Sequence, residues 1–457
     1  MKLALWILIA FSAHTTMAAT IAVIDSGTDV KHVDLINNIW MNAGEVDNNG
    51  RDEDGNGYQD DIYGWNFAES NNLVMDRKYL GTFSADPYLF FDIQGKMFMG
   101  TASAAELKWV EEKRKDPLFA KEMGKFGNFV HGTHVAGITV DGNSNGSILS
   151  VKLIPTEISP FFHGLKTQSN LFKTVSSEDS DGIRMGILKA GLALLATQQM
   201  VLLEEIAAYV AGHKADIANG SFGTGYNQSK MITDNAFKLL FQRDPTADES
   251  DKVAKFFLST LITEGQNMVN AAPNTLFVFA SGNDGMNNDI YPTSPTNIDA
   301  GNVISVAATY KHDFIAPFSN YGTKTVDVAA PGMLINSTIP GNEYLKVSGT
   351  SQAAPYVANV AAQIKDANPE LLPVQIKKIL MGTVDKKSYL SAKVKAQGIV
   401  NMKRATHAAK LTLATDVDSA ISEAIIQISD EVQDTGMTKA SSRAFAIVPI
   451  PLTPLFK

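Results

Sequence analysis

The sequence predicts an α/β protein of three layers, in which a mainly parallel central sheet lies between helices. Several apolar runs end at a glycine or an acid, which is typical of buried parallel strands. The runs cover residues 20–29, 276–285, 303–308 and 326–332. Helical patterns separate them, for example over 181–211 and 230–271. With 457 residues and 45% hydrophobic content, the chain can bury the large core that this fold requires.

The first 19 residues are typical of a secretory signal peptide. Lys2 precedes an apolar run over 3–11, and the small residues Ala18 and Ala19 follow as a cleavage site. The run is too short to span a bilayer, which disfavours the alternative of a short membrane anchor. We find no later segment of spanning length. The prediction is an exported protein, secreted or periplasmic, without a stable membrane span.

Charge and cysteine content narrow the class of protein. The net charge is −9 and the basic residues form no cluster, which argues against a nucleic-acid partner. The sequence has no cysteine, so no disulfide can form. An exported fold of this kind must depend on packing and on any metal that it binds.

The first predicted strand, within residues 20–29, ends at Asp25 and a glycine turn. In open α/β sheets ligands bind at the carboxyl ends of the strands. Asp25 is therefore placed like a site residue, although an aspartate in a plain strand-to-loop turn gives the same pattern.

Residues 47–61 form a loop that is rich in carboxylates and turn-forming residues. Asp52, Asp54 and Asn56 occupy alternate positions, as in a calcium-binding loop, and Gly57 stands where the sharp turn is needed. An EF-hand would have glutamate at the twelfth position, which here is Tyr63. Either Asp60 or Asp61 would then have to complete the ligand set. The loop predicts a calcium site, and a solvated acidic turn remains the alternative.

A second stretch whose side chains could take part in catalysis or metal binding covers residues 128–138, where a small-residue helix contains His131 and His134. The two histidines lie one turn apart and could be zinc ligands. However, no glutamate lies between them as in His-Glu-x-x-His, and Gly132 and Ala136 indicate close helix packing instead. The role of His131 therefore depends on which side chains surround it.

The third stretch covers residues 347–358, where small residues surround Ser351 immediately before a helical pattern. Gly349 allows a tight turn, and Pro355 is tolerated only near the first helical turn, so the helix begins at about Ser351. The serine would then lie at a helix N-terminus, where backbone N–H groups and the helix dipole favour an oxyanion. The alternative is a plain N-cap on an alanine-rich helix.

Four of these residues together supply the parts of an acyl-transfer site. Ser351 would be the nucleophile, and His131 the base that takes and returns its proton. Asp25 would fix the imidazole tautomer. The amide of Asn283, at the end of the strand over 276–285, would stabilise the oxyanion together with a backbone N–H.

Three motifs in this order resemble those of the subtilisin-like serine proteases, the subtilase family. They are Asp-Ser-Gly at 25–27, His-Gly-Thr-His-Val-Ala-Gly at 131–137 and Gly-Thr-Ser-Gln-Ala-Ala-Pro at 349–355. The resemblance implies a three-layer subtilisin-like fold and an exported serine endopeptidase that cleaves peptide bonds through an acyl-enzyme. It also implies that Asn283 is the oxyanion asparagine and that His134 is structural.

The resemblance extends to the substrate and metal sites. It implies that the segment after residue 218 binds a peptide as an added strand. The expected substrate-binding residues are Asn219, Ser221, Phe222, Gly223 and Gly282. The acidic loop is similar to a family loop that often binds calcium, which implies a structural Ca²⁺.

The resemblance covers residues 20–408, with large helical insertions at about 73–129, 155–214 and 226–272, and it leaves 409–457 as a C-terminal extension. The insertions could wall off the cleft or recruit a protein partner, and the extension could pack or stay mobile. The family usually has an inhibitory propeptide, whereas here Ile21 follows the signal segment almost at once. For this reason a catalytically silent relative that binds a partner remains the alternative to a protease.

Overall fold

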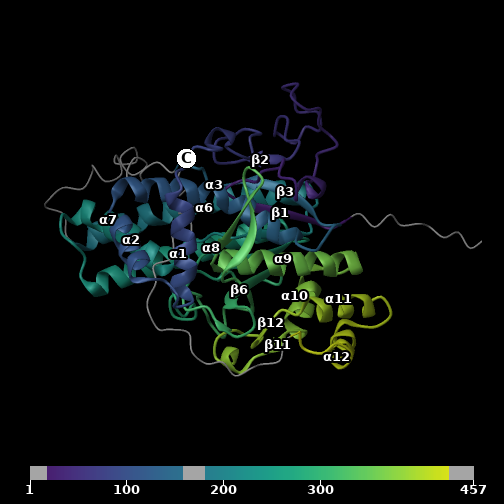
Figure 1. Cartoon of the computed structure of the whole chain (residues 1–457). Helices are drawn as coiled ribbons and strands as arrows, with labels where there is room; N and C mark the ends of the chain where they lie inside the picture. Colours follow the sequence, from purple (N-terminus) through teal and green to yellow (C-terminus); the bar gives the residue numbers. More distant parts are fainter. Residues whose placement is uncertain (1–17, 158–180, 432–457) are drawn as a thin grey trace, which may run out of the picture.

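The computed structural model describes residues 18–157 and 181–431 (Figure 1). Its main sheet has the strand order β11-β12-β8-β6-β5-β4-β1-β3-β2, with β7 paired to β6. The strands of this sheet are β1 (Thr20–Asp25), β2 (Gly64–Asn66), β3 (Ser147–Lys152), β4 (Ile217–Gly220), β5 (Leu276–Ala280), β6 (Val303–Tyr310), β7 (Phe314–Ile315), β8 (Val328–Pro331), β11 (Asp385–Lys386) and β12 (Gly398–Ile399). All described pairings in it are parallel except β6 with β7 and β11 with β12.

Helices cover both faces of this sheet, so the predicted three-layer α/β fold is confirmed. The helices are α1 (Asp86–Phe98), α2 (Ala104–Arg114), α3 (Pro117–Val140), α6 (Asp181–Gly212), α7 (Tyr226–Phe241), α8 (Ala247–Ala271), α9 (Thr350–Ala367), α10 (Pro373–Gly382), α11 (Met402–Leu411) and α12 (Val417–Gln427). A separate hairpin pairs β9 (Ile335–Ile339) with β10 (Glu343–Val347).

Strand β1 shows why the sequence forms three layers. Ile21 and Val23 join the core under α3 and α9, whereas Ala22 and Ile24 join the core under α6, α7 and α8. Because successive side chains point to opposite faces, a strand covered on both sides must be apolar throughout. The continuous apolar run before Asp25 therefore marks a strand in the middle of the molecule.

The insertion predicted at about 73–129 forms α1, α2 and the first half of α3. These helices have an aromatic core of their own, which includes Phe90, Phe91, Phe126 and Phe129. Helix α3 then continues without a break to Val140 and carries His131. The insertion and the histidine motif therefore share one rigid helix.

The other two insertions form α6, α7 and α8, and residues 158–180 lie outside the described part. Helix α6 is long and apolar enough to cross a membrane by length and composition, so the expectation that no later segment reaches that length does not hold for it. In the fold it packs against α8 and the sheet, as the core helix of a globular protein does.

Near the end of the described chain, α11 and α12 pack together beside α10 (Figure 1). Arg404 of α11 is buried and donates to Asp385 (2.9 Å) and to Asp430 (2.7 Å). The described part of the predicted extension, 409–431, thus packs on the rest of the fold. Most of the predicted signal segment, 1–17, and residues 432–457 lie outside the described residues.

Candidate active site

The four predicted catalytic residues lie on elements that meet at one edge of the sheet. Asp25 ends β1, Asn283 follows β5, His131 lies in α3, and Ser351 is the second residue of α9. Strands β1 and β4 are hydrogen-bonded neighbours, with Ile24 opposite Gly220. The residues that follow these two positions are Asp25 and Ser221, so both lie at adjacent strand ends.

The Asp25 carboxylate holds the His131 ring. Nδ1 of His131 donates to Oδ1 of Asp25 at 2.6 Å, and the Ser26 N–H donates to the same oxygen at 2.7 Å. The Asp25 side chain is 0% exposed and that of His131 is 12% exposed. An ionised carboxylate has no proton and can only accept hydrogen bonds. The ring proton is therefore held on Nδ1, and Nε2 is left free to act as a base.

Helix α3 lies so close to the turn after β1 that only glycine fits at one position. A Cβ at Gly132 would lie 2.2 Å from the carbonyl oxygen of Gly27. The N–H of Gly132 donates to Oγ of Ser26 (3.0 Å), and the N–H of Asp29 donates to Oγ1 of Thr133 (2.9 Å). This close approach fixes the histidine against the aspartate.

Ser351 is 2% exposed and lies in the first turn of α9, one residue after the helix begins at Thr350. Its carbonyl would normally accept from the backbone N–H of residue 355, but Pro355 has none. The Ser221 hydroxyl donates to this carbonyl instead, at 2.9 Å. The proline thus frees a backbone acceptor that ties α9 to the end of β4.

The Ser351 hydroxyl itself donates to the carbonyl of Ser221 at 3.2 Å. Ser221 is held in turn by the side-chain amide of Asn219, which donates to its Oγ at 2.9 Å. The two serines therefore form a reciprocal pair. The Ser351 hydroxyl therefore bonds to this carbonyl and not to Nε2 of His131, and it would have to exchange the two partners to act as the predicted nucleophile.

Asn283 is oriented by the residue before the serine. Its Oδ1 accepts from the backbone N–H of Thr350 (2.9 Å) and from its hydroxyl (3.0 Å). The other end of the amide, the Nδ2 group, therefore remains as a hydrogen-bond donor. It lies 3.5 Å from the position of a Cβ at Gly349, which is an ordinary contact distance. This arrangement suits an amide that stabilises an oxyanion.

The predicted substrate-binding residues occupy two kinds of environment. Gly223 is partly exposed, and the next residue exchanges backbone hydrogen bonds with Ser294, with Thr224 N–H to Ser294 O at 2.8 Å. Gly282 has a φ of 111°, which favours glycine, and a Cβ there would clash with Asn320. Phe222, by contrast, is buried and packs on Phe279 in the core.

The second histidine of the motif has a different environment from the first. His134 is fully buried, and its Nε2 donates to the carbonyl of Leu345 at 2.9 Å. Burial lowers the pKa of His134 to about 4, so the ring is neutral. Since His131 uses Nδ1 for Asp25 and His134 uses Nε2 for a carbonyl, both rings already have partners other than a metal.

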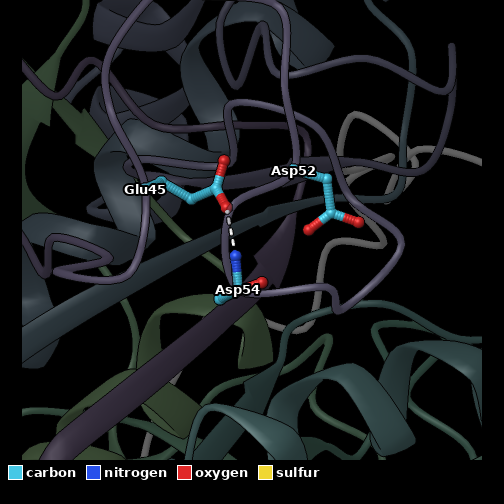
Figure 2. Close-up of side chains that lie close together, drawn as sticks. All are labelled: Glu45, Asp52 and Asp54. Atoms are coloured by element: carbon cyan, nitrogen blue, oxygen red, sulfur yellow. Dashed lines mark hydrogen bonds between the residues drawn. The ribbon is translucent and has the colours of Figure 1, made fainter.

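The acidic loop brings three carboxylates together, as Figure 2 shows for Glu45, Asp52 and Asp54. One oxygen from each lies within 4.8 Å of the others. Sequence reasoning predicted Asp52 and Asp54 but missed Glu45, which precedes the acid-rich stretch. Its carboxylate accepts from the N–H groups of Glu53 (2.7 Å) and Asp54 (3.1 Å), so it folds the loop around itself.

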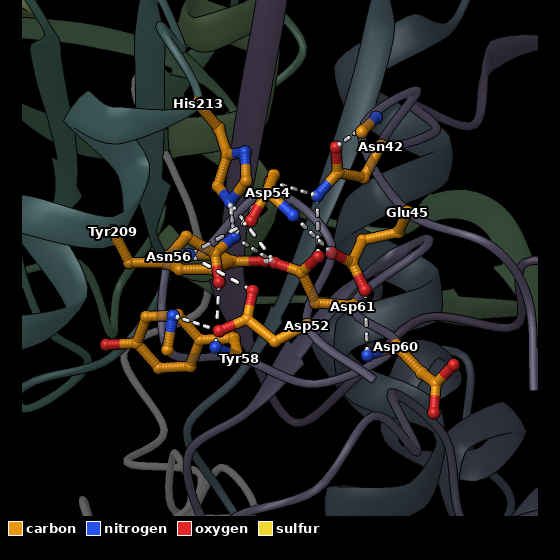
Figure 3. Close-up of polar contacts among 12 residues, drawn as sticks. Asn42, Glu45, Asp52, Asp54, Asn56, Tyr58, Asp60, Asp61, Tyr209 and His213 are labelled. Carbon is orange, nitrogen blue, oxygen red and sulfur yellow. Dashed lines mark hydrogen bonds and ion pairs between the residues drawn. The ribbon is translucent and has the colours of Figure 1, made fainter. Parts of the chain in front are cut away.

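Two further predicted ligands lie in different directions (Figure 3). Asp61 is buried and accepts from Asn42 (2.6 Å), Tyr209 (2.8 Å) and His213 (3.2 Å). Burial alone would raise the pKa of Asp61, but the bonds from His213, Asn42 and Tyr209 hold it below its usual range. The carboxylate of Asp60 points away from the cluster.

Asp60 instead serves the neighbouring turn, where it accepts from the N–H groups of Asn49 (3.0 Å) and Gly50 (2.9 Å). Asn56, the remaining predicted ligand, lies between the two groups of acids. Its side-chain amide donates to Asp54 (3.2 Å) and to Asp61 (3.1 Å). The cluster thus presents mainly oxygen atoms, which are the ligands of hard divalent cations.

Comparison with known proteins finds similarity to members of one protein family. The family model described as "Subtilase family" matches residues 17–401. Subtilisin-like protease 1 of Plasmodium falciparum is 27% identical over 416 residues, which are 90% of this chain and 46% of that protein. Subtilisin Savinase of Lederbergia lenta is 38% identical over 143 residues, 31% of this chain and 50% of that protein.

These matches span about half the length of the two relatives. Among solved structures, a cold adapted subtilisin-like serine proteinase aligns with a TM-score of 0.43 and 18% identity. The alignment covers 83% of this chain and 89% of that one.

Proposed function

Because the chain belongs to the subtilase family of serine proteases, we propose that it is an exported serine endopeptidase that hydrolyses peptide bonds through Asp25, His131 and Ser351. The observation that carries the proposal is the 2.6 Å bond between a fully buried carboxylate and Nδ1 of His131. A buried carboxylate that holds the imidazole in one tautomer is what a general base needs.

The chemistry proceeds in two halves. Nε2 of His131 takes the proton of Ser351 Oγ as the oxygen attacks the peptide carbonyl carbon, and the Asn283 amide with the Ser351 N–H stabilises the oxyanion. The imidazolium then protonates the leaving amine, and an acyl-enzyme remains. Water, activated by the same imidazole, hydrolyses this ester and restores the serine.

Labelling with a fluorophosphonate probe tests the nucleophile. We expect the wild type to be labelled at Ser351 and to cleave casein, and Ser351→Ala to lose both properties. Ser259→Ala, an exposed serine on α8, is the matched control and should keep both. A wild type that is folded but neither labelled nor able to cut casein would make this a partner-binding protein instead.

For substrate binding we propose that a peptide adds as a strand along residues 221–223. The partly exposed Gly223 leaves the backbone accessible, and Ser221 and Asn219 fix its direction through their hydrogen bonds. Phe222 would act from the core, as a support for this edge. A peptide-library cleavage profile would define the preferred residues.

We also propose that the acidic loop binds a structural Ca²⁺. Glu45, Asp52 and Asp54 would hold it, because three converging carboxylates repel one another unless a cation lies between them. Asp61 and Asn56 adjoin this group, whereas Asp60 is occupied by its own turn. The ion would tie residues 45–54 together and would stabilise the folded state, since it binds only there.

A further inference from the structure

The chain enters the sheet between Ala18 and Ala19. Ala18 is exposed, whereas Ala19 is 1% exposed and its carbonyl accepts from the N–H of Ser147 at 3.1 Å. The N–H of Ala19 donates to Oδ1 of Asp366 at 2.7 Å. The nitrogen of a buried residue thus faces a carboxylate at the base of the sheet. This base lies opposite the catalytic edge, which is the edge of the sheet that carries Asp25 and Ser351.

A second carboxylate lies at the same place. The N–H of Thr20 donates to Oδ2 of Asp216 at 3.1 Å, and the negative charge of Asp216 acts on Asp366. Lys365 is the basic side chain that forms an ion pair here among the described residues, at 3.7 Å from Asp216, and it also donates to the carbonyl of Leu371. The two acids are therefore incompletely compensated.

The position of Asp366 adds to this imbalance. It lies in the last turn of α9, where the helix dipole is negative and disfavours a carboxylate. Burial raises the pKa of Asp366, and the nearby Asp216 raises it further. A positive group beside Asp366 would relieve both effects.

We propose that hydrolysis of the Ala18–Ala19 peptide bond generates an α-ammonium group on Ala19 that forms an ion pair with Asp366 and Asp216. In this step water adds across the bond, the carbonyl carbon of Ala18 becomes a carboxylate, and the nitrogen of Ala19 becomes the ammonium. The small residue Ala18 before the cut is the kind that signal peptidases accept. The signal segment predicted from the sequence ends one residue later, at Ala19, but cleavage there would remove a buried residue whose carbonyl accepts from Ser147 of β3.

The ion pair would join three elements that each carry a site residue at the other end. Strand β1 runs from Thr20 to Asp25, β4 follows Asp216 and leads to Asn219, and α9 runs back from Ser351 to Asp366. Removal of the signal segment would thus hold together the ends of β1, β4 and α9 that lie opposite these site residues. This inference concerns maturation and does not depend on proteolytic activity.

The first test is the intact mass of the full chain after secretion by a bacterial host. We expect a mature protein that begins at Ala19, with an α-amine that reacts with acylating reagents at neutral pH far more slowly than the amine of a peptide with the same N-terminal sequence. An N-terminus at another residue, or an amine that reacts as fast as the peptide, would overturn the proposal.

The second test separates an ammonium from an ordinary backbone N–H. Insertion of Gly-Ser between Ala18 and Ala19 keeps the cleavage after Ala18 but leaves the Ala19 nitrogen an amide. Asp366→Asn should lower the Tm by about 3–5 °C in the wild-type background and by much less in the insertion background. Asp418→Asn, which removes an exposed carboxylate, is the control and should have the same small effect in both. Equal losses for Asp366→Asn in the two backgrounds would refute the ion pair.

Discussion

The catalytic edge and the acidic loop are built in opposite ways. At the catalytic edge, side chains from β1, α3, α9 and the turns after β4 and β5 meet through hydrogen bonds between distant parts of the chain, and Asp25 and Ser351 are buried. In the acidic loop most bonds join residues close in sequence, and Asp52 is exposed. The first site is therefore made by the fold itself, whereas the second is an open group of carboxylates at which we propose a cation.

This difference predicts which changes damage chemistry and which damage stability. A substitution at the catalytic edge alters a group whose surroundings remain in place, so activity should fall while the fold persists. A substitution in the loop alters a group that holds the chain locally, so stability should fall and chemistry should change little. The following four experiments order these effects from the largest to the smallest.

Asp25→Asn should reduce kcat by about 10⁴-fold, because an amide can donate to Nδ1 and favour the wrong imidazole tautomer. The measurement is steady-state hydrolysis of a peptide substrate, with the Tm recorded in parallel. Asp244→Asn, an exposed acid paired to Lys238, is the control and should leave kcat unchanged. A loss at Asp25 below about tenfold would mean that the carboxylate does not orient the base.

Asn283→Ala should reduce kcat by about 10²–10³-fold with little change in KM, a loss of about 2.7–4 kcal/mol that is known from subtilisin, a protein of the same family. Thr350→Val removes the hydroxyl that binds Asn283 Oδ1 but keeps the backbone bond, so its effect on kcat should be smaller and in the same direction. If Thr350→Val instead raised KM alone, the orientation of Asn283 would not depend on this hydroxyl.

His134 should make the catalytic scaffold sensitive to acid. Its folded-state pKa is about 4 and its ordinary value is 6.5, so the unfolded chain binds the proton more readily. The contribution of the neutral His134 ring to the free energy of unfolding is complete above about pH 6.5. It is lost as the pH falls from about 6.5 to 4, by about 3 kcal/mol in total.

Urea unfolding of the wild type and of His134→Gln at pH 7.5, 5.5 and 4.5 would measure this contribution. We expect the stability difference between the two proteins to shrink as the pH falls. His407→Gln replaces a histidine that bonds to Gln427 near the surface, and its difference from the wild type should change less with pH. A constant difference for His134→Gln would show that the buried ring is not the source of the acid sensitivity.

Calcium removal should have the smallest effect, and it should fall on stability. At a calcium concentration of about 100 Kd, chelation costs about 2.7 kcal/mol of folding free energy. Glu45→Gln should weaken this response in a thermal melt, whereas Asp60→Asn should keep it, because Asp60 binds the Asn49 and Gly50 N–H groups. A response that is lost in Asp60→Asn and kept in Glu45→Gln would assign the ion to the other acid.

Sequence reasoning predicted the three-layer fold because β1 and β5 are apolar on both faces, and only a strand covered on both sides has that pattern. The signal for Ser351 was equally local, since Gly349 and Pro355 bracket the start of α9. The family resemblance implied that residues 73–129, which form α1 and α2, are an insertion, but the attachment of these helices to the same helix as His131 could not be predicted.

The sequence does not predict contacts that depend on how a loop turns or on which strands become neighbours. Glu45 was missed because its partners are backbone N–H groups whose position depends on the turn of the loop. The occupation of Asp60 by its own turn has the same cause. The role of Phe222 as a core residue depends on Phe279 in a neighbouring strand, which no local pattern reveals.

Helix α9 has a consequence for how the protein can change. It carries Ser351 at one end and Asp366 at the other, about 22 Å apart along its axis. One inserted residue between them would rotate the far end by about 100° and move Asp366 away from the nitrogen of Ala19. Every residue of α9 is buried or half-buried, so the packing around it restricts its side chains, and the two ends together fix its length and rotational phase.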